Sequence, residues 1–396
     1  MQKRFLLSQS RFYHALFTVV CLLVSASAQA QDSTQTEFKP GGKIWGYAFG
    51  DYAYKLHADQ EKRGSVQYSG LAQDYNSFNF RRIYLGYDYQ FTPNISSQFL
   101  LAHESSAEGN PNNPDVLTNG NRGVHIKAMN LRFKNVIPRA TIVVGQQSTP
   151  TFATLGDGIW GYRSIEKTIA DMRGISSSTD LGIGVFGRIG RNENLGYELM
   201  VGNNNGAKLE NNSFKKLYTS LYVYLFNKKV VVQGNYETGR TALSPVSKNS
   251  STFRAFVAYK TPATTIGVEA FTQVRSNNNS FLRGVADTAF TDAQASGISF
   301  FATQRLVKEK LRAFARLDVF NPDQQYNSDR NYLGSYNTNT ETFVTLGLDY
   351  MPYKNIHIMP NIWLDQFQNK APGTSGALKK DYDLVARMTL YFLFNR

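Results

Sequence analysis

The chain has 396 residues, a formal net charge of +13 and a single cysteine, Cys21. Such a basic balance can attract nucleic acid, acidic lipid or small anions. No linker or shift in composition divides the chain into domains, and after residue 30 no apolar run is long enough to cross a membrane as a helix. Any membrane span in that region must therefore consist of strands.

Residues 1–30 have the order of parts that defines a secretory signal peptide. Basic residues precede the apolar run 15–24, and small residues follow as far as Ala30. We therefore predict export with cleavage after Ala30, which leaves 31–41 as a short periplasmic segment. A membrane anchor is the alternative, but the run has about half of the roughly 20 apolar residues that a spanning helix needs. Export argues against nucleic acid as a partner, and the exported chain has no cysteine and hence no disulfide.

From residue 42 onward, apolar residues alternate with small, polar or charged ones in segment after segment. The stretch 311–320 alone allows a helix, with Arg312 and Arg316 on one face, or a strand that places both opposite Leu317. The same period of two recurs along the chain, which favours strands throughout. We predict about sixteen, at 42–56, 76–91, 95–104, 123–134, 140–147, 181–190, 195–203, 215–226, 229–238, 251–261, 264–275, 296–306, 310–320, 341–351, 355–366 and 381–394.

The connections between these strands alternate between short and long without exception. Turns such as 92–94 and 227–228 are followed by long polar connections such as 105–122 and 321–340. A soluble β-sandwich would not be expected to separate its loops so regularly. The pattern predicts an all-β fold over 42–396, a transmembrane antiparallel barrel with short periplasmic turns and long external loops.

The charged residues indicate which face of each strand meets water. An arginine that faces lipid near the middle of the bilayer costs roughly 2 to 4 kcal/mol, so the charged face must point into the lumen. About sixteen strands enclose a lumen wide enough for an aqueous channel. The mixed lining predicts a hydrated lumen with a mild preference for anions. The lumen residues are the basic Arg188, Arg254, Lys260, Arg275, Arg305, Arg312, Arg316 and Arg387 and the acidic Glu198, Glu237, Glu269, Asp318, Asp365 and Asp383.

The longest connection, 148–180, contains a predicted helix over 163–174. Ser164 is a suitable N-cap and Gly174 a suitable stop, and apolar residues recur at helical spacing between them. Docked against the inner wall, this helix would narrow the pore and present Arg163, Lys167 and Arg173 to solutes. An external helix that covers the barrel mouth is the alternative.

Four stretches resemble the phosphate-selective porin O/P family of outer-membrane porins. They are "FNFRRIYLGYDY" (78–89), "GQQSTPTF" (145–152), "RGISSSTDLGIGVFG" (173–187) and "LGYELMVGNNNG" (195–206). The resemblance implies a trimeric porin of 16 strands, with a third external loop folded into the channel and a ladder of basic residues in the lumen. It also implies that Arg81 and Arg82 match the paired arginines of that family. The family often has a basic residue where this chain has 147–149, which contains none.

These observations predict an outer-membrane porin for passive diffusion of small hydrophilic solutes. A mild preference for anions is expected, with phosphate as the candidate that the resemblance suggests. The expected partners are small anions or other small solutes, outer-membrane lipid and two further copies of the chain. An outer-membrane barrel enzyme, with His103 beside Glu104, and a closed structural or adhesive barrel are the alternatives. No cofactor or metal is expected, because no histidine pair has ligand spacing.

Overall fold

The computed structural model describes residues 38–64, 67–104, 123–243, 245–283, 287–333, 338–369 and 380–395. The predicted signal peptide lies outside the described residues, and so do parts of the connections after the third strand and before the last. Within the described ranges, no helix is long and apolar enough to cross a membrane.

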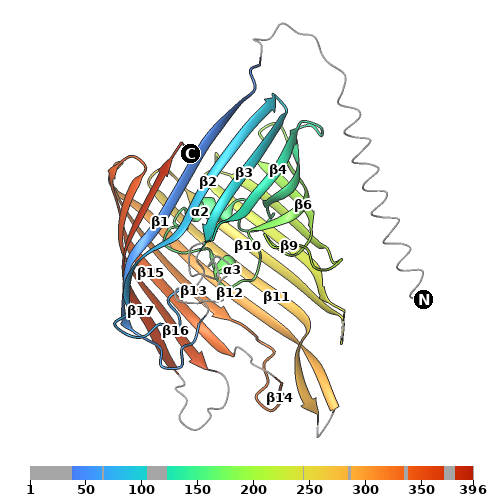
Figure 1. Ribbon diagram of the computed structural model, residues 1–396, viewed down its shortest axis with the longest axis vertical. Coiled ribbons are helices and arrows are strands. Elements are labelled where there is room, and N and C mark those ends of the chain that lie inside the picture. Colours follow the sequence, from blue (N-terminus) through green and yellow to red (C-terminus); the bar gives the residue numbers. More distant parts are fainter. Residues whose placement is uncertain are drawn as a thin grey trace, which may run out of the picture.

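Sixteen antiparallel strands form a closed wall (Figure 1). β1 (Gly41–His57) pairs on one side with β2 (Asn76–Thr92) and on the other with β17 (Lys380–Phe394), which closes the sheet into a barrel. This confirms the predicted fold class. The other wall strands are β3 (Ile95–Glu104), β4 (His125–Lys134), β5 (Ala140–Ser148), β6 (Thr179–Ile189), β7 (Leu195–Gly202), β8 (Lys216–Leu225), β9 (Val230–Ala242), β10 (Lys248–Lys260), β11 (Thr264–Arg283), β12 (Asp287–Val307), β13 (Leu311–Asn321), β15 (Asn339–Tyr353) and β16 (Ile356–Asn369).

The two ends of the barrel differ in their connections. At one end, which we call the turn end, short turns join the strands and the first and last strands meet, with Gly46 opposite Phe394. The turn between β8 and β9 shows how the sequence sets these turns: Asn227 and Lys228 both have positive φ, at 56° and 64°. Such left-handed residues match the twist of a tight hairpin. The long connections leave the opposite end, which we call the loop end.

The predicted connection 276–295 is wrong, because most of it is strand. β11 and β12 continue to Arg283 and from Asp287 as a hairpin that projects at the loop end (Figure 1). The short strand β14 (Asn331–Tyr332) pairs with β11 beside this hairpin. The extension has no apolar alternation, since it has no lipid face to cover. Its ladder consists of backbone hydrogen bonds, which a search for hydrophobic periodicity does not detect.

Side chains alternate between the two faces of the wall. In β13, Arg316 is 3% exposed and Asp318 is fully buried inside the barrel, whereas Leu317 and Val319 are 40% and 45% exposed outside. The same alternation leaves a belt of exposed apolar side chains around the barrel. A belt of that extent suits contact with lipid rather than with water.

Chain segments fill much of the interior. In one hydrophobic cluster Trp160 packs near the wall residue Phe301, and in another Ile169 packs near Phe271. Tyr68, from the connection between β1 and β2, is buried in a third cluster inside the barrel. The lumen is therefore narrowed by inward-folded connections, and the spaces left between them are the candidate route for solutes.

Candidate functional site

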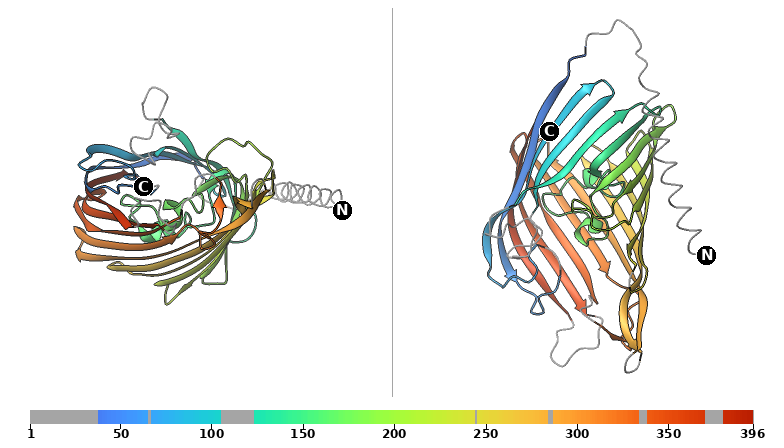
Figure 2. Two further views of the ribbon diagram at one scale, coloured as in Figure 1. Left: turned by 90° about the horizontal axis from the view of Figure 1, so that it is seen from below. Right: turned by 45° about the vertical axis from the view of Figure 1, so that its right-hand side comes forward.

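The connection between β5 and β6 lies inside the ring of strands, as both views in Figure 2 show. It carries two short helices, α2 (Gly156–Trp160) and α3 (Ile169–Met172). The buried side chains of Trp160, Ile165 and Ile169 face the inner wall. This places apolar contacts at the wall and leaves polar groups of the segment toward the remaining lumen.

The predicted helix over 163–174 is wrong in its first half. Residues 163–168 are irregular, and α3 begins after Thr168 rather than after Ser164. The predicted stop is present, because Gly174 has a left-handed φ of 64°. The C-terminal half alone forms the helical turn that the spacing suggested.

Contacts far away in sequence explain the irregular half. In a helix, the carbonyls of residues 164–167 would accept hydrogen bonds from backbone N–H groups four residues later. Here side chains donate to all four carbonyls, which competes with helix formation. Three wall residues, Arg81, Arg316 and Arg387, supply most of the donors, and we call them the clamp arginines. The contacts are Arg81 to Ser164 and Ile165 (3.4 Å), Arg387 to Ile165 (3.2 Å), Trp160 to Glu166 (2.9 Å) and Arg316 to Lys167.

The clamp arginines are buried, and the wall itself binds them as well. Arg81 forms an ion pair with Asp51, and Arg316 forms one with Asp318. Arg387 donates to the side-chain oxygen of Asn361 at 2.8 Å. Most of their donors therefore have partners within the protein, although Nη1 of Arg387 has no hydrogen-bond partner among the described residues.

Two further predicted site residues have partners of the same kind. Arg173 forms ion pairs with Glu341 and, at 3.4 Å, with Asp365. Arg254 forms an ion pair with Glu269 at 3.0 Å.

Four predicted site residues lie toward the turn end instead. The guanidinium of Arg188 lies 5.4 Å from the ring centre of Tyr222. Lys260 and Arg312 donate to the backbone carbonyls of Gly158 at 3.4 Å and Pro262 at 2.9 Å. Arg305 of β12 is paired directly with Arg312 of the neighbouring strand β13. Within the described residues, the guanidinium of Arg305 has no hydrogen-bond partner.

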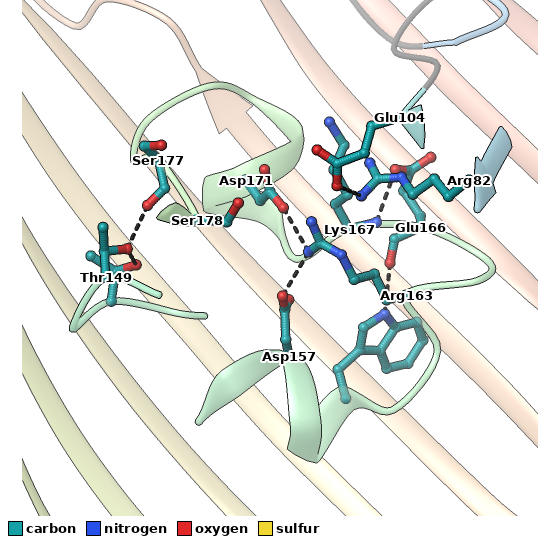
Figure 3. Close-up of polar contacts among 12 residues, drawn as sticks. Arg82, Glu104, Thr149, Asp157, Arg163, Glu166, Lys167, Asp171, Ser177 and Ser178 are labelled. Carbon is teal, nitrogen blue, oxygen red and sulfur yellow. Dashed lines mark hydrogen bonds and ion pairs between the residues drawn. The ribbon is translucent and has the colours of Figure 1, made fainter. Parts of the chain in front are cut away.

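Arg163 links the two short helices, as Figure 3 shows. Its guanidinium lies 2.6 Å from Asp157 in α2 and 2.7 Å from Asp171 in α3. Burial raises the pKa of Asp157. Burial also acts to raise the pKa of Asp171, but the positive charges of Arg163 and Lys167 outweigh it and leave that pKa below its usual value. The link therefore holds the two helices together through one shared cation.

A second charged group lies beside this link (Figure 3). Glu104 lies 3.2 Å from Arg82 and 2.8 Å from Lys127. The sequence analysis missed Lys127, because the pairing of β3 with β4 shifts register between Leu100 and Leu101, which breaks the alternation used to assign faces. The break was visible in the sequence, since Ile126 and Met129 are apolar at a spacing of three.

These groups border a cavity of about 590 Å³ toward the loop end, which we call the loop-end cavity. Its charged lining includes Arg82, Lys127, Arg163, Lys167 and Lys208 against Glu104 and Asp171. The ammonium of Lys167 has no hydrogen bond or ion pair within the described part of the chain. A cation without a hydrogen bond or ion pair among the described residues thus lies at the narrowed part of the lumen, near the carboxylates of Asp171 and Glu166.

Two smaller cavities continue from it toward the turn end. The middle cavity, about 390 Å³, shares Lys127, Arg163 and Ser178 with the loop-end cavity. The turn-end cavity, about 200 Å³, shares Gly158 and Tyr391 with the middle one and is also lined by Lys260 and Arg312. The shared walls place the three cavities in series along the inner segment.

His103 and Glu104, the pair considered for an enzyme, bind different groups. His103 bonds to the carbonyl of Gly123 at 2.8 Å, whereas Glu104 binds Arg82 and Lys127. Among the described residues, no cluster of histidine and acidic side chains has the geometry to hold a metal ion.

No protein-family model and no curated protein sequence matches the chain. Solved structures do match in fold. The outer-membrane channel DcaP of Acinetobacter baumannii has a TM-score of 0.63 at 12% identity, over 92% of this chain and all of that one. OmpF of Salmonella typhi has a TM-score of 0.55 at 11% identity, over 89% and 97%. A trimer form of OmpT, an outer-membrane protein of Vibrio cholerae, has a TM-score of 0.51 at 11% identity, over 90% and 99%. The chain thus has the fold of outer-membrane barrels, and its resemblance to the O/P family stays a prediction.

Proposed function

We propose that the protein is a bacterial outer-membrane channel for passive diffusion of small hydrophilic solutes, with a mild preference for anions. The observation that carries the channel is the series of three cavities along residues 148–180, from the loop end to the turn end. The fold shared with outer-membrane barrels and the exposed apolar belt support the location. In this proposal the turn end faces the periplasm and the loop end faces outward.

The anion preference rests on Lys167. The charge of six predicted site arginines is compensated by ion pairs with carboxylates: Arg81, Arg82, Arg163, Arg173, Arg254 and Arg316. The unpaired ammonium of Lys167 borders the loop-end cavity and can replace part of the hydration shell that an anion loses on entry. Phosphate is one anion that this cavity could take, and the phosphate selectivity implied by the O/P resemblance is proposed on that basis. We also propose a homotrimer, as in the trimer form of OmpT. The expected mass of the protein in detergent is then that of three chains.

Planar-bilayer recordings test both parts of this function. We expect stepwise currents from the unsubstituted protein and a chloride-to-potassium permeability ratio above one, measured from the reversal potential in a salt gradient. Lys167→Gln should lower that ratio roughly two- to fivefold, because one charge at contact distance contributes on the order of 1 kcal/mol in water-like surroundings. Phosphate should compete with the chloride current.

Lys308→Gln is the matched control, because it removes the same charge from a side chain that is 79% exposed on a turn. It should leave the ratio unchanged. An absence of current steps would contradict the channel. A ratio of one or less in the unsubstituted protein would contradict the anion preference alone.

A further inference from the structure

The middle cavity has an aromatic wall, which diffusion of small ions does not need. Five rings form this wall, and we call them the aromatic track: Trp45, Tyr47, Phe49, Tyr84 and Tyr391. Their ring centres follow one another at separations of 4.4 to 6.4 Å, from Trp45 to Tyr47, from Tyr47 to Tyr84 and Tyr391, and from Tyr391 to Phe49. Tyr47 and Tyr391 are half-buried and are the rings that a solute in the cavity can contact, whereas the nearly buried Trp45, Phe49 and Tyr84 support them from behind.

The local sequence fixes this arrangement. Trp45, Tyr47 and Phe49 are alternate residues of β1 and so share its inner face. Gly86 on the neighbouring strand allows the indole of Trp45 to lie flat, because a Cβ at that position would be 2.3 Å from the ring. The indole N–H donates to Asp88 at 2.9 Å, which sets its orientation. The indole is held in place by these contacts before any solute arrives.

The opposite wall is polar and nearly neutral. It is formed by hydroxyl side chains such as Thr154 and Ser164, by the ion pair between Asp157 and Arg163, and by Lys127, whose charge Glu104 compensates at 2.8 Å. One oxygen of Asp157 accepts from Arg163, while the other, Oδ1, has no hydrogen-bond partner among the described residues. The wall thus offers hydrogen-bond donors and acceptors without a large net charge.

We propose that the middle cavity binds the pyranose ring of a sugar. Aromatic rings attract the apolar C–H face of such a ring, and a few placed polar groups give the orientation that specificity requires. Hydroxyl groups at the edge of the sugar can both donate and accept, which suits the mixed opposite wall. The side chains of Thr154 and Ser164 line the cavity and can both donate to and accept from such hydroxyls. This inference rests on the proposed function, since it names a class of solute for the same route.

Four probe solutes separate the contribution of the ring from that of charge. Glucose has the pyranose ring, and glucuronate has the ring with an acid group. Sorbitol and gluconate are their open-chain counterparts, with similar hydroxyls and no ring face. In single-channel recordings we expect glucose and glucuronate to reduce the ion current in a saturable way, and sorbitol and gluconate to require at least roughly fivefold higher concentrations, as for loss of one aromatic contact.

Variants at Tyr47 then test the track itself. Tyr47→Leu removes the flat ring and should weaken block by glucose roughly fivefold. Tyr47→Phe keeps the ring and should retain most of the block by glucose. Tyr259→Leu is the control, because this tyrosine is exposed on the outer face. Lys167→Gln should weaken glucuronate relative to glucose without changing the preference for a ring.

The outcomes for the two proposals are distinct. Equal block by glucose and sorbitol overturns the sugar site even if currents and anion preference are present. So does block by benzoate, a flat aromatic anion without hydroxyl groups, if glucose does not block. If no current appears, calorimetry on protein in a detergent without sugar headgroups decides the question. Binding of glucose that Tyr47→Leu weakens supports the site there, and absence of binding overturns it.

Discussion

Buried arginines in this barrel mostly bind the protein itself. Arg81, Arg316 and Arg387 each hold a carbonyl of the inner segment, and each is also held by an acidic or amide side chain of the wall. Charge-assisted hydrogen bonds of this kind are strong when desolvated, and they position groups accurately. Lys167 differs because its ammonium has no hydrogen bond or ion pair among the described residues and borders the loop-end cavity, so under the proposed function it should contribute to the ion preference.

The pH dependence of ion preference tests this role of Lys167. Burial lowers the pKa of Lys167 below the usual lysine value of 10.5, and Arg82 and Arg163 lower it further against the opposing effect of Asp171 and Glu166. Because a lysine loses its charge above its pKa, the anion preference should fall as the pH rises toward 10.5, earlier than exposed lysines titrate. Reversal potentials measured across that range check this.

Lys167→Arg is the control for the pH experiment, since a guanidinium stays charged over the whole range. It should keep its anion preference where the unsubstituted protein loses it. The same decline in both proteins would assign the titration to other groups.

At the scale of elements, the segment 148–180 is held by clamps rather than by its own helices. α2 and α3 are too short to be stable alone, and the irregular residues between them have no backbone hydrogen-bond ladder. Wall side chains supply that missing bonding. The width of the channel therefore depends on a small number of arginine–carbonyl contacts.

Removing one clamp should loosen the segment. Arg387→Met keeps most of the side-chain volume but loses the bonds to Ile165 and Asn361. We expect the free energy of unfolding to fall by about 1.5–3 kcal/mol, as for hydrogen bonds to charged groups. Urea titrations in detergent measure this, and open-channel current noise should increase.

Arg305→Met provides the comparison for the clamp, because within the described residues the guanidinium of Arg305 has no hydrogen-bond partner. It should change neither stability nor noise. If both variants behave alike, the clamp does not determine the width of the channel.

The elements that the sequence predicts well are those with a lipid face. Alternation in β13 or β17 directly reflects one apolar and one polar environment, so their bounds match closely. The helix over 163–174 could not be excluded from local residues, because its carbonyls are bound by arginines at least 83 residues away or by Trp160. The hairpin extension of β11 and β12 has no environment that would impose alternation, so it was not detectable.

For the site, the sequence identified Arg163 and Lys167 as residues of the inner segment but not their neighbours. Asp157 and Asp171 become partners of Arg163 only when α2 and α3 come together. Lys127 was hidden by the register shift in β4. The aromatic track combines β1, β2 and β17, which meet only when the barrel closes.

For the whole molecule, the wall strands expose a belt of apolar side chains on the outside and bury charged side chains inside, whereas a soluble protein exposes its charged groups. Leu317 lies on the outer face of β13, one residue from the buried Arg316. Leu317→Arg should therefore destabilise the barrel in lipid vesicles by roughly 2–4 kcal/mol, the cost of an arginine near the middle of the bilayer. Reversible unfolding from vesicles measures this cost.

Leu209→Arg is the reference, since Leu209 is 92% exposed in a connection outside the strands. It should have little effect on stability. Equal effects of the two substitutions would contradict the assignment of the outer face to lipid.

The pairing of β1 with β17 also has a consequence for how the protein is made. Gly46 meets Phe394 across this seam, so residues from the two ends of the chain must find each other before the cylinder exists. A nascent chain that lacks its last strand cannot be a slightly smaller pore. It would be an open sheet with two unpaired edge strands, each able to pair with another copy of the chain. Such a truncated chain should therefore aggregate instead of forming a channel.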